Sequence, residues 1–215
     1  FNHALAQLSA HEFVLQYLVN GLAVQHLYVG DDFRFGYARS GDFALLQKLG
    51  EEYGYAVENL ATVRDNGKRI SSTRIRAALL QGNLAEAARC LGRDYQLSGR
   101  VMRGDQRGRT IGFPTLNVAL AHRPLRGVFV VRVDGLQAAP LYGVANVGNR
   151  PTLQGDDRFL LEVHVFDFAR EVYGQRVSVS FMHRLRDEQK FDSFTELRGQ
   201  IMQDVEQTKE LLNKS

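Results

Sequence analysis

Glycine and arginine gather in residues 99–117, and their chemistry points to a phosphate ligand. The stretch holds four glycines and four arginines in nineteen residues and ends in Pro114-Thr115-Leu116-Asn117. Glycine lets backbone amides approach a ligand closely, and the arginine guanidinium matches the geometry of phosphate oxygens. Thr115 and Asn117 supply oxygen atoms of the kind that Mg²⁺ prefers. We therefore predict that this stretch binds a polyphosphate together with its metal ion.

Composition alone leaves a second interpretation of this stretch open. Gly- and Arg-rich segments are also typical of mobile, solvated loops. The stretch is not a Walker A motif, because no Gly-Lys-Ser or Gly-Lys-Thr closes it.

A single carboxylate, Glu162, lies in an otherwise apolar run at 159–166. In a strand, alternation would place it on one face with Leu160, His164 and Phe166. A carboxylate among apolar neighbours is costly to bury unless it has a partner or a task. Loss of hydration also makes it a better proton acceptor, which suits a general base. The alternative is an outward-facing glutamate on a half-exposed strand.

The string from Gly108 to Asn117 closely resembles the signature of riboflavin kinases, specifically the kinase module of the bacterial bifunctional riboflavin kinase/FMN adenylyltransferase (FAD synthetase) family. The resemblance implies ATP- and Mg²⁺-dependent phosphorylation of riboflavin to FMN, with Glu162 taking the proton from the ribityl 5′-hydroxyl. It gives His164 no catalytic role, and we interpret this residue as a packing or hydrogen-bonding residue. We expect the loop from Gly99 to Gly112 to fold over ATP, and Thr115 and Asn117 to hold the metal. The expected ATP- and phosphate-binding residues are Gly99, Arg100, Gly104, Gly108, Arg109, Gly112, Thr115 and Asn117.

Two other segments of the second half have more than one interpretation. Residues 143–152 form a Gly/Asn/Pro-rich turn, which is either a hairpin connection or, as the resemblance implies, lies near the flavin and nucleotide. The basic run at 183–186 is predicted to be a solvated strand end rather than a nucleic-acid patch.

The first part of the chain contains two segments that could carry chemistry. Residues 29–36 directly follow a predicted strand, where open α/β sheets place ligand loops. Residues 70–76 bring hydroxyls to a helix start, which serves either plain N-capping or phosphate binding. Both segments resemble the FMN adenylyltransferase module of the same family, which implies flavin contacts for the first and ATP contacts for the second. Many relatives carry Asn at the position of Asp32, so its role stays open. The residues expected at that site are Asp32, Phe33, Phe35, Gly36, Ser71, Ser72, Thr73 and Arg76.

The adenylyltransferase module of this family also opens with a His-x-Gly-His motif, which is missing here. No two of the six histidines are three positions apart. We therefore expect the chain to lack the front of that module and to form no FAD from FMN and ATP. Its first residue, Phe1, also predicts that it starts inside a longer natural protein.

The first ninety or so residues carry the pattern of an α/β layer. Short apolar strands at about 25–29 and 55–63 alternate with capped helices, which indicates a parallel sheet. A capping box begins at Ser9, and Gly54 is placed to end the helix at about 42–53. Ser71 or Ser72 and then Asn83 are predicted to cap two more helices. By the resemblance, this region is an incomplete Rossmann-like nucleotidyltransferase portion.

From Tyr95 onward the pattern changes to short strands without helices between them. Runs at 127–133, 141–147, 159–166 and 176–182, with a pair around Val101 and Phe113, favour an antiparallel barrel. A capping box at Ser193 predicts a C-terminal helix. The resemblance implies the same fold, a six-stranded Greek-key β-barrel with a trailing helix. We predict two domains, 1–94 and 95–215. The expected apolar face of the helix is Leu197, Ile201, Val205, Thr208 and Leu212.

Bulk properties limit the classes of function. A net charge of +3 and a pI near 9.1 fit an anionic ligand but are too mild to demand nucleic acid. No stretch is long enough to span a bilayer. Cys90 is the single cysteine and is predicted to be a packed thiol, which suits the cytoplasm. We expect riboflavin, FMN and ATP as partners, and neither nucleic acid nor membrane. The alternative is a non-catalytic barrel that binds a flavin nucleotide or RNA.

Overall fold

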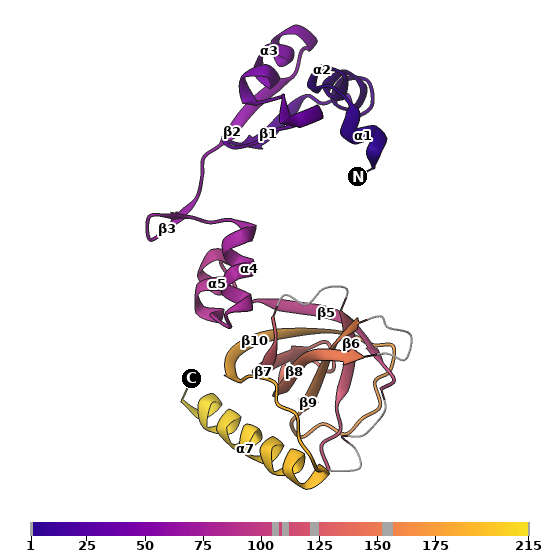
Figure 1. Cartoon of the computed structure of the whole chain (residues 1–215), viewed down its shortest axis with the longest axis vertical. Helices are drawn as coiled ribbons and strands as arrows, with labels where there is room; N and C mark the ends of the chain where they lie inside the picture. Colours follow the sequence, from indigo (N-terminus) through magenta and orange to yellow (C-terminus); the bar gives the residue numbers. More distant parts are fainter. Residues whose placement is uncertain (1, 105–107, 109–111, 121–124, 152–156, 215) are drawn as a thin grey trace. The chain divides into compact units, whose positions relative to one another are not determined.

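The structure is a computed structural model that describes residues 2–104, 108, 112–120, 125–151 and 157–214. The chain divides into two compact units, Phe1–Ile70 and Ser71–Ser215 (Figure 1). The helices between residues 72 and 91 therefore pack in the second unit, whereas the sequence pattern grouped them with the first region. The assignment of functional domains to 1–94 and 95–215 stays a prediction, because compactness does not define a functional module.

The first unit is a small α/β layer. It contains two parallel strands, β1 and β2, whose register pairs His26 with Ala56 and Gly30 with Leu60. Its buried core includes Val14 and Leu46, both with no exposed surface. The elements are α1 (His3–Gln7), α2 (Ala10–Phe13) with a π-helical continuation (Val14–Val19), β1 (His26–Gly30), a 3-10 turn (Tyr37–Arg39), α3 (Phe43–Tyr53), β2 (Ala56–Leu60), and the hairpin strands β3 (Arg64–Asp65) and β4 (Lys68–Arg69).

Local signals in this unit act as predicted. Ser9 and Glu12 form a complete capping box at the start of α2. The Asp42 side chain accepts a hydrogen bond from the Leu45 amide at 3.0 Å and caps α3. Gly54 then ends α3 in the left-handed conformation, with φ of 79°. These contacts are local along the chain, which is why the sequence alone predicts them.

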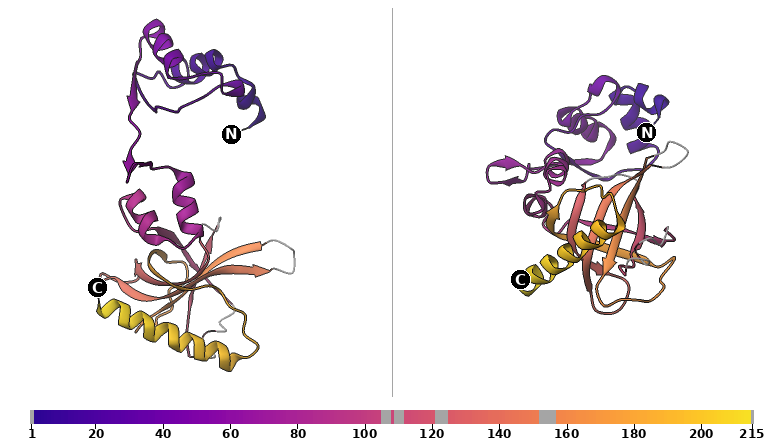
Figure 2. Two further views of the ribbon diagram at one scale, coloured as in Figure 1. Left: turned by 60° about the vertical axis from the view of Figure 1, so that its left-hand side comes forward. Right: turned by 60° about the horizontal axis from the view of Figure 1, so that its bottom comes forward.

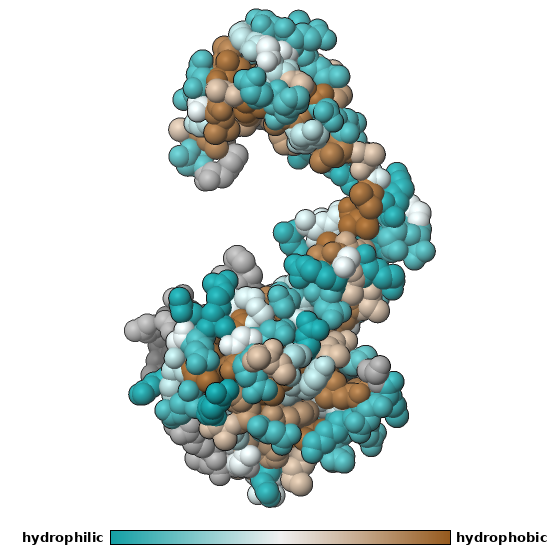
Figure 3. Space-filling model, turned by 180° about the vertical axis from the view of Figure 1, so that it is seen from behind, coloured by the Kyte–Doolittle hydropathy of each residue, from teal (hydrophilic) through white to brown (hydrophobic). Residues whose placement is uncertain are grey.

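The sheet of the first unit leaves apolar side chains exposed. Parallel sheets are normally covered on both faces. Here Tyr28 on β1 and Leu60 on β2 remain more than half exposed, as does Val63 beyond β2. Apolar residues reach the surface of this unit in the space-filling view (Figure 3). A narrow sheet with uncovered apolar surface agrees with the prediction of an incomplete nucleotidyltransferase portion.

The second unit begins with two short helices and continues as a closed six-stranded barrel. The order of strands around the barrel is β10-β5-β6-β9-β8-β7, and every neighbouring pair is antiparallel. Strands β7, β8 and β9 follow one another, and β10 returns to lie beside β7, which is the Greek-key order. The elements are α4 (Ser72–Leu80), α5 (Leu84–Leu91), β5 (Gln96–Met102), β6 (Leu116–Leu120), β7 (Gly127–Asp134), β8 (Leu141–Pro151), β9 (Asp157–Val165), β10 (Arg176–Arg186) and α7 (Phe194–Asn213).

The barrel interior is filled by alternating side chains of its strands. Phe129 and Phe181 meet edge to face, with ring centroids 5.3 Å apart. On β9, Leu161 and Val163 point inward and have no exposed surface. Helices α4 and α5 join the same core, and the thiol of Cys90 is buried on α5 as predicted. The outward-facing side chains of β9 are therefore available for a site on the outer wall.

Helix α7 packs against the outer wall of the barrel (Figure 2). Ser193 caps it as predicted, accepting a hydrogen bond from the Glu196 amide at 3.2 Å. The Glu196 carboxylate accepts from the Asp192 amide, so the predicted capping box is displaced by one residue on this side. The predicted face is the covered one, but it also contains a buried acid, Asp204. Among the described residues, no helix is both long and apolar enough to cross a membrane.

Candidate active site

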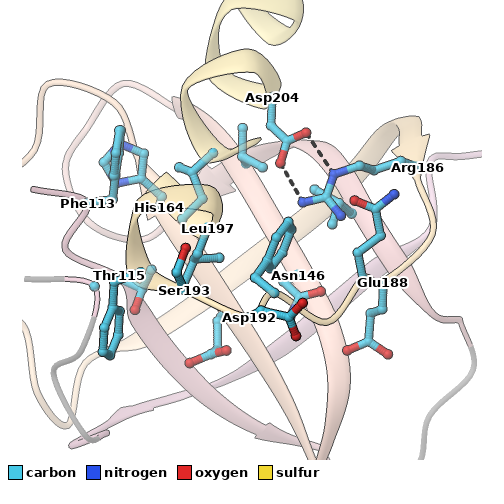
Figure 4. Close-up of a pocket in the computed structure, with 18 residues that line it drawn as sticks. Phe113, Thr115, Asn146, His164, Arg186, Glu188, Asp192, Ser193, Leu197 and Asp204 are labelled. Atoms are coloured by element: carbon cyan, nitrogen blue, oxygen red, sulfur yellow. Dashed lines mark hydrogen bonds and ion pairs between the residues drawn. The ribbon is translucent and has the colours of Figure 1, made fainter. Parts of the chain in front are cut away.

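A cavity of about 530 Å³ lies between the outer wall of the barrel and α7 (Figure 4). This volume is within the usual range of small-molecule sites. Val128 and Val144 line it from the barrel, and Leu197 and Ile201 line it from α7, so part of it is an apolar slot. Its polar lining includes Gly108, Thr115, Asn146, Glu162, His164, Arg186, Glu188, Gln189, Asp192, Ser193 and Asp204.

Strand register places five side chains in one row across the outer wall. Asn117 on β6 is opposite Glu162 on β9, which is opposite Asn146 on β8. The row continues through Val128 on β7 to Arg186 on β10. Strands in a sheet are about 4.8 Å apart, so the three steps from Glu162 to Arg186 span roughly 14 Å. The row therefore runs from three polar residues, through the apolar Val128, to a cation.

Glu162 occupies the setting that alternation predicted. It shares the outer face of β9 with His164, is half-buried, and lines the same cavity as Thr115. It thus faces outward from the barrel, as the alternative interpretation had it, but into the space covered by α7. Glu162 and Thr115 come from different parts of the chain and meet because β6 and β9 are neighbours in the barrel.

Asn117 is buried with one unsatisfied atom. It is 6% exposed, and its Oδ1 has no hydrogen-bond partner among the residues that the structure describes. The Gly104 backbone covers it so closely that a Cβ at residue 104 would lie 2.5 Å from Asn117 Nδ2. Buried polar atoms usually have a partner, so Asn117 Oδ1 is a candidate contact for an ion or a ligand group. Asn117 does not line the cavity itself but lies directly beside Glu162.

The segment before β6 is attached to β9. His164 Nδ1 is 2.9 Å from the carbonyl oxygen of Pro114, and the His164 ring meets Phe113 edge to face at 5.2 Å. Figure 4 shows the Phe113 and His164 side chains side by side at the cavity. The Phe113 amide in turn donates to the Gly108 carbonyl at 2.8 Å. His164 is therefore a packing and hydrogen-bonding residue, as predicted.

An ion pair that the sequence pattern did not predict lies at the far end of the cavity. Arg186 Nε and Nη2 donate to the two oxygens of Asp204 at 2.9 and 2.7 Å, drawn as dashed lines in Figure 4. Gln200 donates a further hydrogen bond to Asp204 at 3.1 Å, and only 4% of the Asp204 side chain is exposed. The prediction of a solvated strand end is therefore wrong for Arg186, which joins β10 to α7. The sequence did contain a signal for this ion pair: Asp204 lies at helical spacing among the apolar residues of the predicted C-terminal helix.

Several predicted phosphate-binding residues lie away from the cavity. Gly99 is inside β5, where a Cβ would collide with Val118, so the loop predicted to begin at Gly99 starts after Met102. Arg100 is exposed and donates to the Gly174 carbonyl at 2.9 Å. Gly112 is exposed and has a positive φ of 88°. Arg109 lies outside the described residues, as do residues 152–156. The prediction of a turn at 143–152 is wrong for residues 143–151, which belong to β8 because they pair with β7 and β9.

In the first unit, the predicted flavin loop is held by its own neighbours. Asp32 pairs with Arg69 at 2.7 Å, and this hydrogen bond lowers the pKa of the Asp32 carboxyl. Phe33 stacks on Phe35 at 5.6 Å, and Phe35 is buried. A Cβ at Gly36 would lie 2.5 Å from the Ala10 amide nitrogen, so the loop is packed closely on α2.

In the second unit, the predicted phosphate segment at the start of α4 is a capped helix terminus. Ser71 accepts a hydrogen bond from the Arg74 amide at 3.2 Å, which is ordinary N-capping. Ser72, Thr73 and Arg76 are exposed on the first turns. Binding of ATP phosphates by this segment stays a prediction.

Comparisons with known proteins agree with this architecture. A family profile described as riboflavin kinase matches residues 91–212, and one described as FAD synthetase matches residues 1–74. The bifunctional riboflavin kinase/FMN adenylyltransferase of Escherichia coli K12 is 49% identical over 206 residues, which cover 95% of this chain and 66% of that protein. Its counterpart in Haemophilus influenzae is 46% identical over 216 residues, or 99% and 70% of the two chains.

The chain belongs to the bifunctional riboflavin kinase/FMN adenylyltransferase family. It spans about two thirds of the length of the relatives it matches. A solved structure described as a macrolide-efflux protein from Streptococcus pneumoniae has the same fold, with a TM-score of 0.74 and 36% identity over 95% of this chain and 66% of that one. The barrel and all of α7 except its last residue lie within the riboflavin kinase match, and so does the whole cavity.

Proposed function

We propose that this chain transfers the γ-phosphoryl group of ATP to the 5′-hydroxyl of riboflavin and releases FMN. One observation carries the proposal: in a chain of this family, Glu162 and Thr115 line one cavity, and Asn117 is the cross-strand neighbour of Glu162. Phosphoryl transfer depends mainly on positioning and charge stabilisation, so a small set of well-placed polar groups is sufficient.

The cavity fits a substrate that is flat and apolar at one end and carries hydroxyls at the other. In the proposal, the flavin ring lies between the valines of the barrel wall, Val128 and Val144, and the α7 side chains Leu197 and Ile201. The ribityl chain then extends along the row of side chains toward Glu162. This direction follows from the row, which is apolar at Val128 and polar at Asn146 and Glu162.

Glu162 is the group that accepts the proton from the 5′-hydroxyl. The bond that forms joins the hydroxyl oxygen to the γ-phosphorus, the bond from that phosphorus to the β-phosphate bridging oxygen breaks, and ADP leaves. The position of Glu162 supports this role, because its carboxylate is half-buried in a cavity rather than surrounded by water. We place the ATP phosphates at the end of the cavity near Gly104 and Gly108, next to Thr115.

Mg²⁺ fits the donor atoms at this end of the cavity. We assign it to the Thr115 hydroxyl and Asn117 Oδ1, because Asn117 Oδ1 is buried without a hydrogen-bond partner in the described chain. Mg²⁺ commonly takes one or two protein oxygens together with substrate phosphates. When bound, the ion neutralises charge on the phosphate oxygens. Asn117→Ala is expected to raise the Mg²⁺ concentration needed for half-maximal rate, and calorimetry of ADP binding with and without Mg²⁺ should show a smaller metal effect.

The proposal includes no adenylyltransferase activity for this chain, because its sequence has no His-x-Gly-His motif. Riboflavin and ATP are its small-molecule partners. The proposal includes a cytoplasmic location, since ATP is the phosphoryl donor and the single cysteine requires no oxidising compartment.

The direct test is incubation of the purified chain with riboflavin, ATP and Mg²⁺, followed by chromatography of the flavins. FMN should accumulate, and none should form without ATP. Riboflavin binding without FMN formation would replace the proposal with a non-catalytic flavin binder. Affinity for RNA that falls steeply with salt would point instead to a nucleic-acid-binding barrel.

A further inference from the structure

His164 makes three contacts, two of which are with the segment before β6. Its Nδ1 is 2.9 Å from the Pro114 carbonyl oxygen, and its ring meets Phe113 and Phe166 edge to face at 5.2 and 5.9 Å. A carbonyl oxygen only accepts hydrogen bonds, so Nδ1 carries the proton and donates. The ring is thereby fixed in both orientation and tautomer.

The Pro114 carbonyl, which His164 contacts, belongs to the residue directly before Thr115, a predicted metal ligand. Pro114 precedes Thr115, and the proline ring fixes φ at this point. A hydrogen bond from the Phe113 amide to the Gly108 carbonyl, 2.8 Å long, ties Gly108 to the same place. Thr115 and Gly108 both line the cavity. The contact between His164 and Pro114 therefore attaches to β9 the segment that leads into Thr115.

His164 also shares its strand and its face with Glu162. Two residues apart on β9, both line the cavity, and the neighbouring Val163 points into the barrel core. One rigid strand thus carries the proposed base and the residue that fixes the opposite side of the site. A displacement of about 1 Å between reacting groups is enough to slow an enzyme strongly.

We propose that His164 is a positioning residue, which sets the location of Thr115 relative to Glu162 through its hydrogen bond to the Pro114 carbonyl. This rests on the proposed kinase function. In this proposal His164 holds the Pro114 carbonyl and is assigned no proton transfer, which the pH profile below tests. Its effect is on the phosphate side, so it should change turnover and use of MgATP but not riboflavin affinity.

Three substitutions separate the hydrogen bond from the ring packing. His164→Ala removes both, His164→Phe keeps an aromatic ring without the donor, and His164→Asn places an amide donor close to the position of Nδ1. One hydrogen bond is worth about 1 kcal/mol, which is roughly a fivefold change in rate. We expect kcat/KM for MgATP to fall roughly fivefold to tenfold in the Ala and Phe variants and to recover in Asn. His183→Ala is the matched control, since His183 is exposed on β10, and its kinetics should equal those of the wild type.

Riboflavin affinity, measured by quenching of flavin fluorescence, should stay within about twofold in all variants. The pH profile of kcat should keep its shape. An Asn variant as slow as Ala, or riboflavin affinity that falls in parallel with kcat, would overturn the positioning role. Loss of one limb of the pH profile would do the same, because it would make His164 a proton-transfer group.

A readout without turnover keeps this proposal separate from the kinase proposal. Hydrogen exchange of the Phe113 amide should be faster in His164→Ala and His164→Phe than in the wild type and His164→Asn. Absence of FMN formation by the wild type would refute the kinase function, whatever the exchange data show. Unchanged exchange in all variants would refute the positioning role, even if FMN is formed.

Discussion

The two units of this chain carry motifs of the same kind, but the described residues of these motifs are engaged differently. In the barrel unit, Thr115 and Glu162 come from different parts of the chain and line one space. In the first unit, Asp32 pairs with Arg69 of β4, and Phe33 stacks on Phe35 within the loop. A motif after a strand becomes a site only where other elements supply the remaining groups.

The difference follows from sheet closure. A closed barrel gives every strand two neighbours, so Glu162 has Asn117 on one side and Asn146 on the other. The first unit has one parallel pair, in which each strand has one neighbour and leaves an edge open. The comparison therefore predicts that function and stability in this chain are concentrated in the barrel unit.

The largest expected effect is the contrast between the two reactions of the family. With riboflavin, ATP and Mg²⁺, the chain should form FMN, and with FMN, ATP and Mg²⁺ it should form no FAD above the enzyme-free background. Chromatography of the flavins measures both in one series. FAD formation at a rate comparable to that of FMN would remove the distinction between the units.

The same substitution in each unit tests the comparison at single residues. Glu162→Gln should lower kcat roughly 100-fold or more while riboflavin affinity stays similar, because it removes the general base and keeps the size of the side chain. Glu58→Gln on β2, whose carboxylate accepts from the Tyr28 hydroxyl at 3.3 Å, is the matched control and should not change kcat. Near-normal turnover of Glu162→Gln would exclude Glu162 as the base.

The two ion pairs should differ in their contribution to stability. Asp204→Ala leaves Arg186 partly buried without its carboxylate, and breaking such a pair costs about 3–5 kcal/mol in the free energy of unfolding. Asp32→Ala removes an exposed pair and should change the free energy of unfolding far less than Asp204→Ala does. Denaturant unfolding of both variants and the wild type measures this. Equal effects would show that burial does not distinguish the pairs.

The smallest expected effect is a pH dependence confined to the first unit. The hydrogen bond from Arg69 lowers the pKa of Asp32 in the folded chain below its unfolded value of about 3.9. The pair therefore stabilises the folded state above that value, and the contribution is lost as the pH falls through the lower folded pKa. The unfolding midpoints of wild type and Asp32→Asn should converge in acid. A difference that grows in acid would mean that the pKa is raised instead.

Much of the fold could be predicted because its signals are local. The caps at Ser9, Asp42 and Ser193 act within three residues, and strand alternation by itself places Glu162 and His164 on one face. The sequence did not predict that the loop starts after Met102, because the packing of Gly99 against Val118 depends on a neighbouring strand. In the sequence, Asp204 is an exception among the apolar residues of one face of α7, but nothing local indicates that its partner is Arg186.

The sequence by itself determined the family, the order of the larger helices and strands, and the face of β9 that carries Glu162, since motif, caps and alternation are properties of nearby residues. Only the tertiary structure decided that Asn117 and Asn146 flank Glu162, that Arg186 meets Asp204, and that His164 holds the Pro114 carbonyl. Each of these pairs joins different elements of the fold. Their meeting is set by the register of the closed barrel and the packing of α7, which no local pattern encodes.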